Sequence, residues 1–247
     1  MTKVAIVRFP GSLDHESAAR AVEGLGAEAV EAWHAEPELP AGADAVLIPG
    51  GFSDGDHLRC GAIASRAPMM DAVRRHAGEG GRVVGICNGF QVLCEAGLLP
   101  GALRRNATLS FVCRQMELEV ADDGTPWTSG RPAGDVISIP VKNNEGAWYG
   151  DPDAARVVLR YREDLLGSTD RVAGIASADG NVMGLMPHPE EACDPLLGST
   201  DGWLWLSILS ATAIPSPTST TPAFSPGPCS TRGPVVGNPD SSGRLCL

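Results

Sequence analysis

The segment that most restricts how this 247-residue chain can fold is RVVGICNGFQ at residues 82–91. Its apolar first half predicts a short buried strand, and its second half predicts a helix that begins at Asn88. Cys87 stands on the turn between them, with Gly85 and Gly89 two residues away on either side. This is the spacing of a nucleophile elbow, where a sharp turn strains the backbone and the crowded neighbouring positions require glycine.

The turn gives Cys87 two possible roles. The N-terminus of the following helix favours a thiolate, which is the nucleophilic form of cysteine. A free cysteine is also often a small residue of the hydrophobic core, and the glycine spacing alone does not separate the two roles. A cysteine nucleophile needs a base and a group that orients the base, so the rest of the chain has to supply them.

His188 is the best candidate for that base among the five histidines. It follows a predicted strand at residues 181–186 and lies between two prolines, which stiffen the loop. Residues two apart in an extended chain point the same way, so Glu190 can hold the second nitrogen of the imidazole. The sequence therefore offers a Cys87–His188–Glu190 triad, although a loop histidine beside a solvated glutamate would leave the same pattern.

Acyl transfer also requires hydrogen-bond donors for a developing oxyanion. The backbone amide of Asn88, which follows the nucleophile, is one candidate. The second is expected from the sequence PGGF at residues 49–52, where Gly50 and Gly51 allow the backbone to approach a substrate closely. The same glycines would also suit an ordinary turn between a strand and a helix.

Strands and helices alternate through the first hundred residues, which is typical of βαβ units and a parallel sheet. Helical patterns follow Ser12, a predicted N-cap, and cover residues 69–77. Apolar runs typical of buried strands occur at residues 4–9, 27–33, 45–48 and 82–86. Later strands without long helices between them are predicted at residues 109–120, 136–141, 156–161, 172–176 and 181–186. We therefore predict an α/β fold in which an antiparallel extension packs on a parallel sheet.

The composition changes near residue 210. Residues 211–247 hold seven of the twenty prolines, with many serines, threonines and glycines and no apolar periodicity. Such a segment buries too little apolar surface to offset its ordering entropy. We predict one domain over residues 1–210, closed by a helix at 203–209, and a disordered tail over 211–247.

Charge and cysteine usage exclude several classes of partner. The net charge of −11 argues against binding to nucleic acid or to an anionic membrane surface, because both need basic patches. No apolar run is long enough to span a membrane, and the N-terminal sequence has no signal-peptide pattern. The seven scattered cysteines form neither a disulfide framework nor a metal-binding spacing. These features predict a cytoplasmic chain without a metal site.

Three motifs together resemble the class I glutamine amidotransferases: GICNGFQ around Cys87, PGGFS at residues 49–53 and MPHPE at residues 186–190. Other stretches resemble, more narrowly, the glutaminase subunits of phosphoribosylformylglycinamidine synthase, an enzyme complex of purine biosynthesis. These stretches are residues 9–12, 55–64, 106–114 and 194–202. The resemblance covers residues 3 to about 210 and implies a three-layer flavodoxin- or Rossmann-like sheet with an antiparallel extension.

The resemblance also implies roles for the site residues. Cys87 would attack the side-chain amide of glutamine and form a γ-glutamyl thioester. His188, oriented by Glu190, would protonate the leaving ammonia and then activate water. The backbone amides expected to hold the oxyanion are those of Gly51 and Asn88. The residues expected to contact the substrate are Gly50, Phe52 and Gln91.

Partners are implied in the same way. Ammonia would pass to a separate synthetase subunit that uses ATP and magnesium, with a small bridging subunit, and this chain itself would need no cofactor. Two departures from the family pattern concern the loops that would meet the synthetase. Leu13 directly precedes Asp14, one residue short of the usual motif, and Asn143–Asn144 stand where the family often has His-Gly.

Three other functions stay open at this point. The same chemistry could serve another biosynthetic pathway, although the narrower motifs favour purine synthesis. A cysteine peptidase, or a stress-protein relative with a similar elbow, would carry the same nucleophile. A non-catalytic regulatory subunit is disfavoured because Cys87, His188 and Glu190 are all present.

Overall fold

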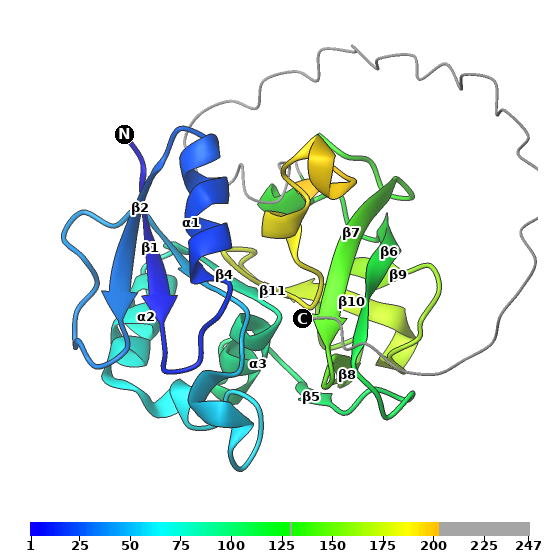
Figure 1. Ribbon diagram of the computed structural model, residues 1–247, viewed down its shortest axis with the longest axis horizontal. Coiled ribbons are helices and arrows are strands. Elements are labelled where there is room, and N and C mark those ends of the chain that lie inside the picture. The colour runs from blue at the N-terminus through cyan, green and yellow to red at the C-terminus, as the bar shows by residue number, and fades with distance from the viewer. Residues whose placement is uncertain (129, 203–247) are drawn as a thin grey trace, which may run out of the picture. The chain divides into compact units, whose positions relative to one another are not determined.

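The computed structural model describes residues 1–128 and 130–202, and its centre is a nine-stranded sheet (Figure 1). The order of the strands is β2-β1-β3-β4-β11-β10-β9-β6-β7. The predicted helix at residues 203–209 and the predicted tail at 211–247 lie outside the described residues. The domain boundary at residue 210 therefore stays a prediction.

Five neighbouring strands of this sheet run parallel to one another. They are β1 (Lys3–Arg8), β2 (Glu28–Trp33), β3 (Ala45–Ile48), β4 (Arg82–Ile86) and β11 (Val182–Leu185). The four inner strands are buried along most of their length, whereas the edge strand β2 is partly exposed. Burial on both faces explains why the sequences of the inner strands are almost continuously apolar.

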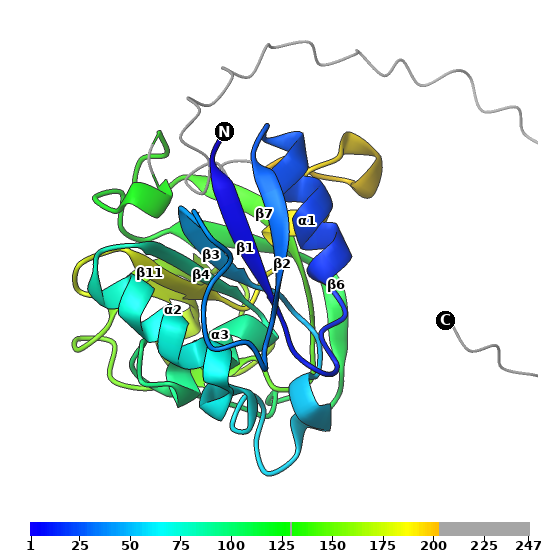
Figure 2. The same ribbon diagram turned by 90° about the vertical axis from the view of Figure 1, so that its left-hand side faces the viewer.

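Three helices cover the two faces of the parallel region. They are α1 (His15–Gly24), α2 (Pro68–Gly78) and α3 (Asn88–Glu95). Figure 2 shows α1 on one face and α2 and α3 on the other, which is the three-layer arrangement that the sequence implied. Among the described helices, none has both the length and the hydrophobicity needed to cross a bilayer.

The antiparallel extension continues the same sheet. It consists of β10 (Val172–Ala176), β9 (Arg156–Tyr161), β6 (Val112–Val120) and β7 (Val136–Asn143). The extension joins the parallel strands edge to edge through the antiparallel β10–β11 pair, so the predicted antiparallel extension of the parallel sheet is confirmed. The strand predicted from residue 109 begins at Val112, because Leu109 adopts a φ of +52° in a turn.

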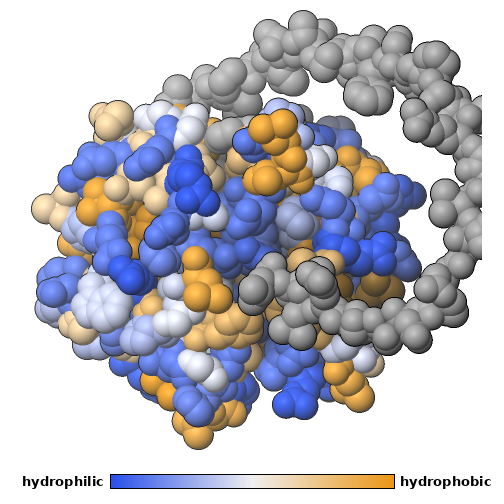
Figure 3. Space-filling view, in the orientation of Figure 1, coloured by the Kyte–Doolittle hydropathy of each residue, from blue (hydrophilic) through white to orange (hydrophobic). Residues whose placement is uncertain are grey.

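Shorter elements complete the described fold. Strands β5 (Ala102–Arg104) and β8 (Ala147–Tyr149) form a separate antiparallel pair. The 3₁₀ turns are Ser53–Asp56, Ala64–Arg66, Pro126–Thr128, Thr169–Arg171, Pro189–Glu191 and Pro195–Leu197. In Figure 3, hydrophilic residues cover most of the visible face and hydrophobic residues lie in separate patches, in keeping with the net charge of −11.

The far edge of the sheet comes back to the ends of its parallel strands. The backbone amide of His188, just after β11, donates to the carbonyl of Pro140 in β7 at 2.8 Å. The carbonyl of Lys142, also in β7, lies 3.8 Å from Sγ of Cys87, which follows β4. A strand from the antiparallel region therefore forms one wall of the site at the carboxyl ends of β4 and β11.

The loop between β1 and α1 reaches the same site. We predicted that Ser12 caps α1, but its hydroxyl instead accepts a hydrogen bond from the amide of Phe9, and the N-cap is Asp14. The side chain of Asp14 makes no capping hydrogen bond. The carboxylate of Asp14 points to the site instead, because the Ser12–Gly51 bridge holds the loop against the strand end of β3.

Candidate active site

The strand, turn and helix around Cys87 form a nucleophile elbow. Cys87 adopts φ +51° and ψ −105°, a conformation that side-chain-bearing residues rarely take. A Cβ at Gly85 would lie 2.5 Å from the carbonyl oxygen of Gly89, and one at Gly89 would lie 2.0 Å from that of Ile48. Both glycines are therefore required by close backbone packing, which fixes the strained turn at the start of α3.

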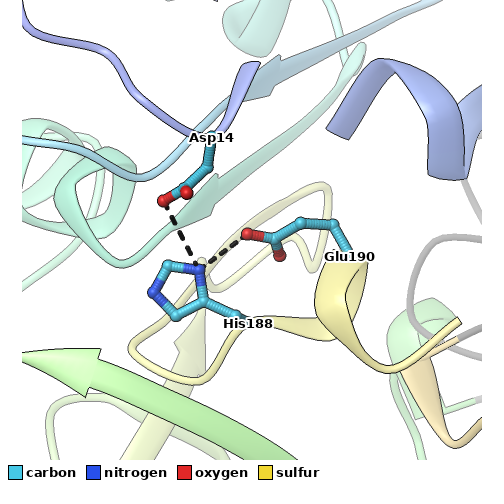
Figure 4. A group of neighbouring side chains, drawn as sticks. All are labelled: Asp14, His188 and Glu190. Carbon is cyan, nitrogen blue, oxygen red and sulfur yellow. Dashed lines mark hydrogen bonds and ion pairs between the residues drawn. The ribbon is translucent and has the colours of Figure 1, made fainter. Parts of the chain in front are cut away.

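His188 and Glu190 lie together in the loop after β11. The Nδ1 atom of His188 is 2.6 Å from Oε1 of Glu190 (Figure 4). Both side chains are buried. With Nδ1 held by Glu190, Nε2 is the nitrogen left to act on Cys87 or on a substrate.

The charges around His188 favour its protonated form. Burial alone would lower the pKa of His188, but the negative charges of Glu190 and Cys87 outweigh it and raise the pKa to about 10. The raised pKa favours an imidazolium at neutral pH, with the Glu190 carboxylate bound at Nδ1 and Cys87 as the other group that favours the charge. A thiolate paired with an imidazolium supplies a ready nucleophile and a ready proton donor.

Cys87 opens onto a cavity of about 250 Å³. Gly51, Phe52 and Gln91 also line this cavity, so the structure brings together four of the site residues that the sequence predicted. The volume lies just below the usual range for drug-sized ligands and suits a small, polar molecule. Gly50, Asn88, His188 and Glu190 lie outside the lining and form the wall behind it.

The two glycines after β3 have different tasks. A Cβ at Gly50 would lie 2.3 Å from Oδ2 of Asp14 and 2.7 Å from Cε1 of His188, so this glycine leaves room for those side chains to meet. Gly51 has a φ of +145°, and a Cβ there would lie 2.5 Å from the carbonyl oxygen of Gly11. Gly50 therefore allows Asp14 and His188 to pack closely behind the cavity. Of the two glycines, only Gly51 lines the cavity.

The side chain of Asn88 connects two predicted parts of the site. Its Oδ1 accepts from the amide of Ser53 at 3.1 Å, and its Nδ2 donates to Oε1 of Gln91 at 2.9 Å. Nε2 of Gln91 in turn donates to the carbonyl of Glu145 at 2.7 Å. This chain of hydrogen bonds orients the Gln91 amide at the cavity wall and fixes the loop after β3 against the elbow.

The sequence analysis missed an ion-pair network beside the triad. Oδ2 of Asp14 lies 3.7 Å from Nδ1 of His188 (Figure 4). Nζ of Lys142 is 2.6 Å from Oδ1 of Asp14 and 3.0 Å from Oε1 of Glu191. Burial would lower the pKa of Lys142, but the two carboxylates outweigh burial and raise it. A signal was present, since Lys142 and Lys3 are the only lysines in the sequence.

Three donor atoms of this cluster are close enough to suit a cation. One ligand atom each from Asp14, His188 and Glu190 lies within 4.8 Å of the others. However, Asp14 already binds the ammonium of Lys142, and Glu190 already binds the imidazole. The chain's own charges therefore balance these carboxylates.

Asn143 is a second residue that the sequence analysis noted only as a departure from the family pattern. Its side chain is buried and lines the cavity. Within the described part of the chain, neither its Oδ1 nor its Nδ2 has a hydrogen-bond partner. A buried amide without partners is costly, so Asn143 is a candidate for a role in the site that the sequence analysis did not assign.

The comparisons agree with this geometry. The profile of the CobB/CobQ-like glutamine amidotransferase domain matches residues 1–203. A protein from Rhodopseudomonas palustris named phosphoribosylformylglycinamidine synthase subunit PurQ is 49% identical over 217 residues, covering 81% of this chain and 93% of its own. The protein of the same name from Rubrobacter xylanophilus is 52% identical over 207 residues, covering 81% of this chain and 94% of its own.

A solved structure gives the same result. The structure of PurLQS from Thermotoga maritima contains a chain that matches with a TM-score of 0.81 and 38% identity, covering 84% of this chain and 97% of that one. The family match and these relatives identify the chain as a glutamine amidotransferase. The chain belongs, within that class, to the PurQ family of phosphoribosylformylglycinamidine synthase subunits.

Proposed function

We propose that this chain hydrolyses glutamine to glutamate and ammonia and supplies the ammonia for phosphoribosylformylglycinamidine synthesis in purine biosynthesis. The observation that carries the proposal is the Cys87–His188–Glu190 arrangement at a small cavity, in a chain about half identical to PurQ proteins. Its relatives act as subunits of a synthase, so this chain is expected to act within a complex as well.

The charges of the site suggest how the reaction proceeds. The Cys87 thiolate attacks the side-chain carbonyl carbon of glutamine, and the His188 imidazolium gives its proton to the leaving amide nitrogen. Ammonia departs and a γ-glutamyl thioester remains. Neutral His188 then takes a proton from water, the hydroxide attacks the thioester, and the thiolate leaves as glutamate is released. Glu190 stabilises the imidazolium in both half-reactions.

The remaining predicted residues have roles consistent with their positions. The backbone amides of Gly51 and Asn88 would donate to the oxyanion, one from the cavity lining and one from the first residue of α3. Gln91 and Phe52 would contact the glutamine from the cavity lining, and Gly50 would act by keeping the wall open. Asn143 joins this set, because it lines the same cavity and its buried amide has no partner among the described residues.

The rim of the cavity suggests where partners bind. Leu13, Phe52 and Phe111 line the cavity, yet they are 62%, 43% and 52% exposed. An apolar rim around a reactive site is typical of a docking surface. We expect the synthetase subunit to bind there, with a small bridging subunit in the complex. ATP and magnesium would be used by the synthetase, with no cofactor in this chain, no nucleic-acid or membrane partner and a cytoplasmic location.

The decisive experiment compares two cysteines of the same cavity. Cys87→Ala should lower the glutamine-dependent activity of the assembled complex by at least about 1,000-fold, because the nucleophile is lost. Activity with ammonium salts should remain, because that chemistry belongs to the synthetase. Cys60→Ala, the matched control, should keep both activities. Loss of the ammonium-dependent reaction in an assembled Cys87→Ala complex would contradict the division of labour, and peptide cleavage by the wild type would favour a peptidase.

A further inference from the structure

We infer that Asp14 and Lys142 are positioning residues whose paired charges set the protonation of His188. The inference deepens the proposed glutamine hydrolysis and rests on it. Neither residue takes part in the bond-making steps above. Both act through the imidazole, from two segments that are far apart in the sequence.

Two carboxylates flank the same imidazole nitrogen. Glu190 Oε1 is 2.6 Å from Nδ1 of His188, and Asp14 Oδ2 is 3.7 Å from it (Figure 4). Each carboxylate would favour the imidazolium by direct attraction. Gly50 makes this approach possible, because a side chain there would overlap both Asp14 and His188. A second carboxylate therefore reaches the base through a position that must be glycine.

Lys142 limits the charge that His188 receives from Asp14. Its ammonium binds Asp14 at 2.6 Å, and Glu191 at 3.0 Å shares the same ammonium. The Asp14 side chain is only 13% exposed, so solvent screens this pair weakly. The charge on Asp14 is therefore largely neutralised while Lys142 is in place, which leaves Glu190 as the dominant carboxylate acting on His188.

The backbone of Lys142 connects the network to the nucleophile. Its carbonyl lies 3.8 Å from Sγ of Cys87, while its side chain extends to Asp14. Among the described residues, the titratable groups around His188 are Cys87 from the elbow, Glu190 from its own loop and Asp14 from the loop after β1. Lys142 and Glu191 lie behind Asp14. Removing Lys142 must therefore change the charge that acts on His188 in the opposite direction from removing Asp14.

The two substitutions have opposite expected signs. Lys142→Met leaves the Asp14 carboxylate uncompensated beside the imidazole, so the pKa of His188 should rise by about one unit. Asp14→Asn removes the carboxylate and leaves the ammonium of Lys142 near the imidazole, so the pKa should fall by about one unit. In the double variant the two changes should largely cancel. A purely structural role would give no such reversal of sign.

The test is an NMR titration of the histidine ring signals in the full-length chain, with the His188 signal assigned by its loss in His188→Gln. Lys142→Arg keeps the charge, so it should titrate like the wild type and controls for folding. Shifts of the same sign in Lys142→Met and Asp14→Asn, or no shift in either, would overturn the inference. The titration does not depend on turnover, so a chain that fails to hydrolyse glutamine refutes the proposed function and leaves this result readable.

A kinetic measurement adds a second readout. A more basic His188 gives up its proton less readily and is a weaker acid for the ammonia-releasing step, so Lys142→Met should lower kcat about tenfold with KM little changed. A rise in KM with kcat unchanged would instead indicate that Lys142 binds the substrate, and would contradict a positioning role.

Discussion

The two ends of the cavity carry the same side chain with opposite surroundings. Cys87 and Cys60 both line the cavity and are 6% and 5% exposed. Cys87 faces the imidazolium of His188, whereas Sγ of Cys60 donates a hydrogen bond to Oε2 of Glu145 at 3.1 Å, with Asp56 close by. The comparison predicts that burial at a site does not by itself make a cysteine reactive, and that the charge of its neighbours decides.

The surroundings of Cys60 favour the protonated thiol. Burial raises its pKa first, and the carboxylates of Glu145 and Asp56 raise it further, to well above its ordinary value. Burial is also the largest cause that raises the pKa of Cys94, and of Cys193 to about 12. A thiolate is stabilised by a neighbouring cation and destabilised by carboxylates and by apolar surroundings. Among the described residues, Cys87 lies beside the His188 imidazole, whereas Cys60 faces two carboxylates, one of which also pairs with the exposed Arg105.

The largest expected effect is therefore a difference in alkylation rate. At neutral pH, iodoacetamide or a glutamine-analogue electrophile should modify Cys87 at least about 1,000-fold faster than Cys60, since each pKa unit changes the thiolate fraction tenfold. Peptide mapping after short exposure gives the order of modification. Cys113, which is exposed, serves as the reference for an ordinary accessible thiol. Equal rates at Cys60 and Cys87 would remove the basis of the comparison.

The second prediction concerns the carboxylate that stabilises the His188 imidazolium beside Cys87. Glu190→Gln removes one of the two negative charges that raise the pKa of His188, so that pKa should fall by about one unit or more. The imidazolium that protonates the leaving ammonia persists only below its pKa, so the alkaline decline of glutamine-dependent turnover should move to lower pH by the same amount. Turnover should fall about 10- to 100-fold.

The matched control for Glu190→Gln is Glu191→Gln, the neighbouring glutamate that binds Lys142 and makes no bond to the imidazole. It should move the decline much less. Equal shifts in the two variants would show that the loop responds to any change of charge, and Glu190 would lose its special role.

Much of the reactive end could be predicted from the sequence, because its determinants are local. The glycines of the elbow lie two residues from Cys87, and Glu190 lies two residues from His188, so turn geometry and strand direction already place them. The strands of the parallel sheet were equally accessible, since their apolar runs are continuous. The strands predicted at 45–48, 82–86, 156–161 and 172–176 match at both ends, and the other predicted strands differ by one to three residues at an end.

The ion-pair network of Asp14 and Lys142 and the carboxylate surroundings of Cys60 could not be predicted in this way. Asp14 and Lys142 are 128 residues apart, and they meet only because the edge strand β7 comes back over the parallel strand ends. Cys60 and Glu145 are 85 residues apart and meet for the same reason. No local pattern encodes a contact that depends on how the antiparallel region is joined to the sheet.

The third prediction concerns the carboxylate that accepts a hydrogen bond from Cys60. Glu145→Gln removes the carboxylate that accepts from Cys60, so the pKa of Cys60 should fall and its alkylation should become several-fold faster, on the order of tenfold. The hydrogen bond from Gln91 goes to the backbone carbonyl of Glu145, so it should survive the substitution. Glu117→Gln, an exposed change in β6, is the control. If Cys60 alkylation is the same in both variants, burial alone keeps this thiol unreactive.

The smallest expected effect concerns residues 215–247, which lie outside the described part of the chain. Seven prolines interrupt every window in which a helix could grow, and Phe224 is the only aromatic residue there, so the segment has little with which to pack. Its Cys229 and Cys246 have no histidine near them in the sequence. Truncation after Ile214 should therefore leave the melting temperature, the ratio of Cys87 to Cys60 alkylation and the glutamine-dependent activity at limiting synthetase unchanged. The competing hypothesis is that this segment covers the apolar rim and sets the affinity for the synthetase. In that case truncation would change activity at limiting synthetase while the alkylation ratio stayed the same, because the charges around both cysteines come from residues before 192.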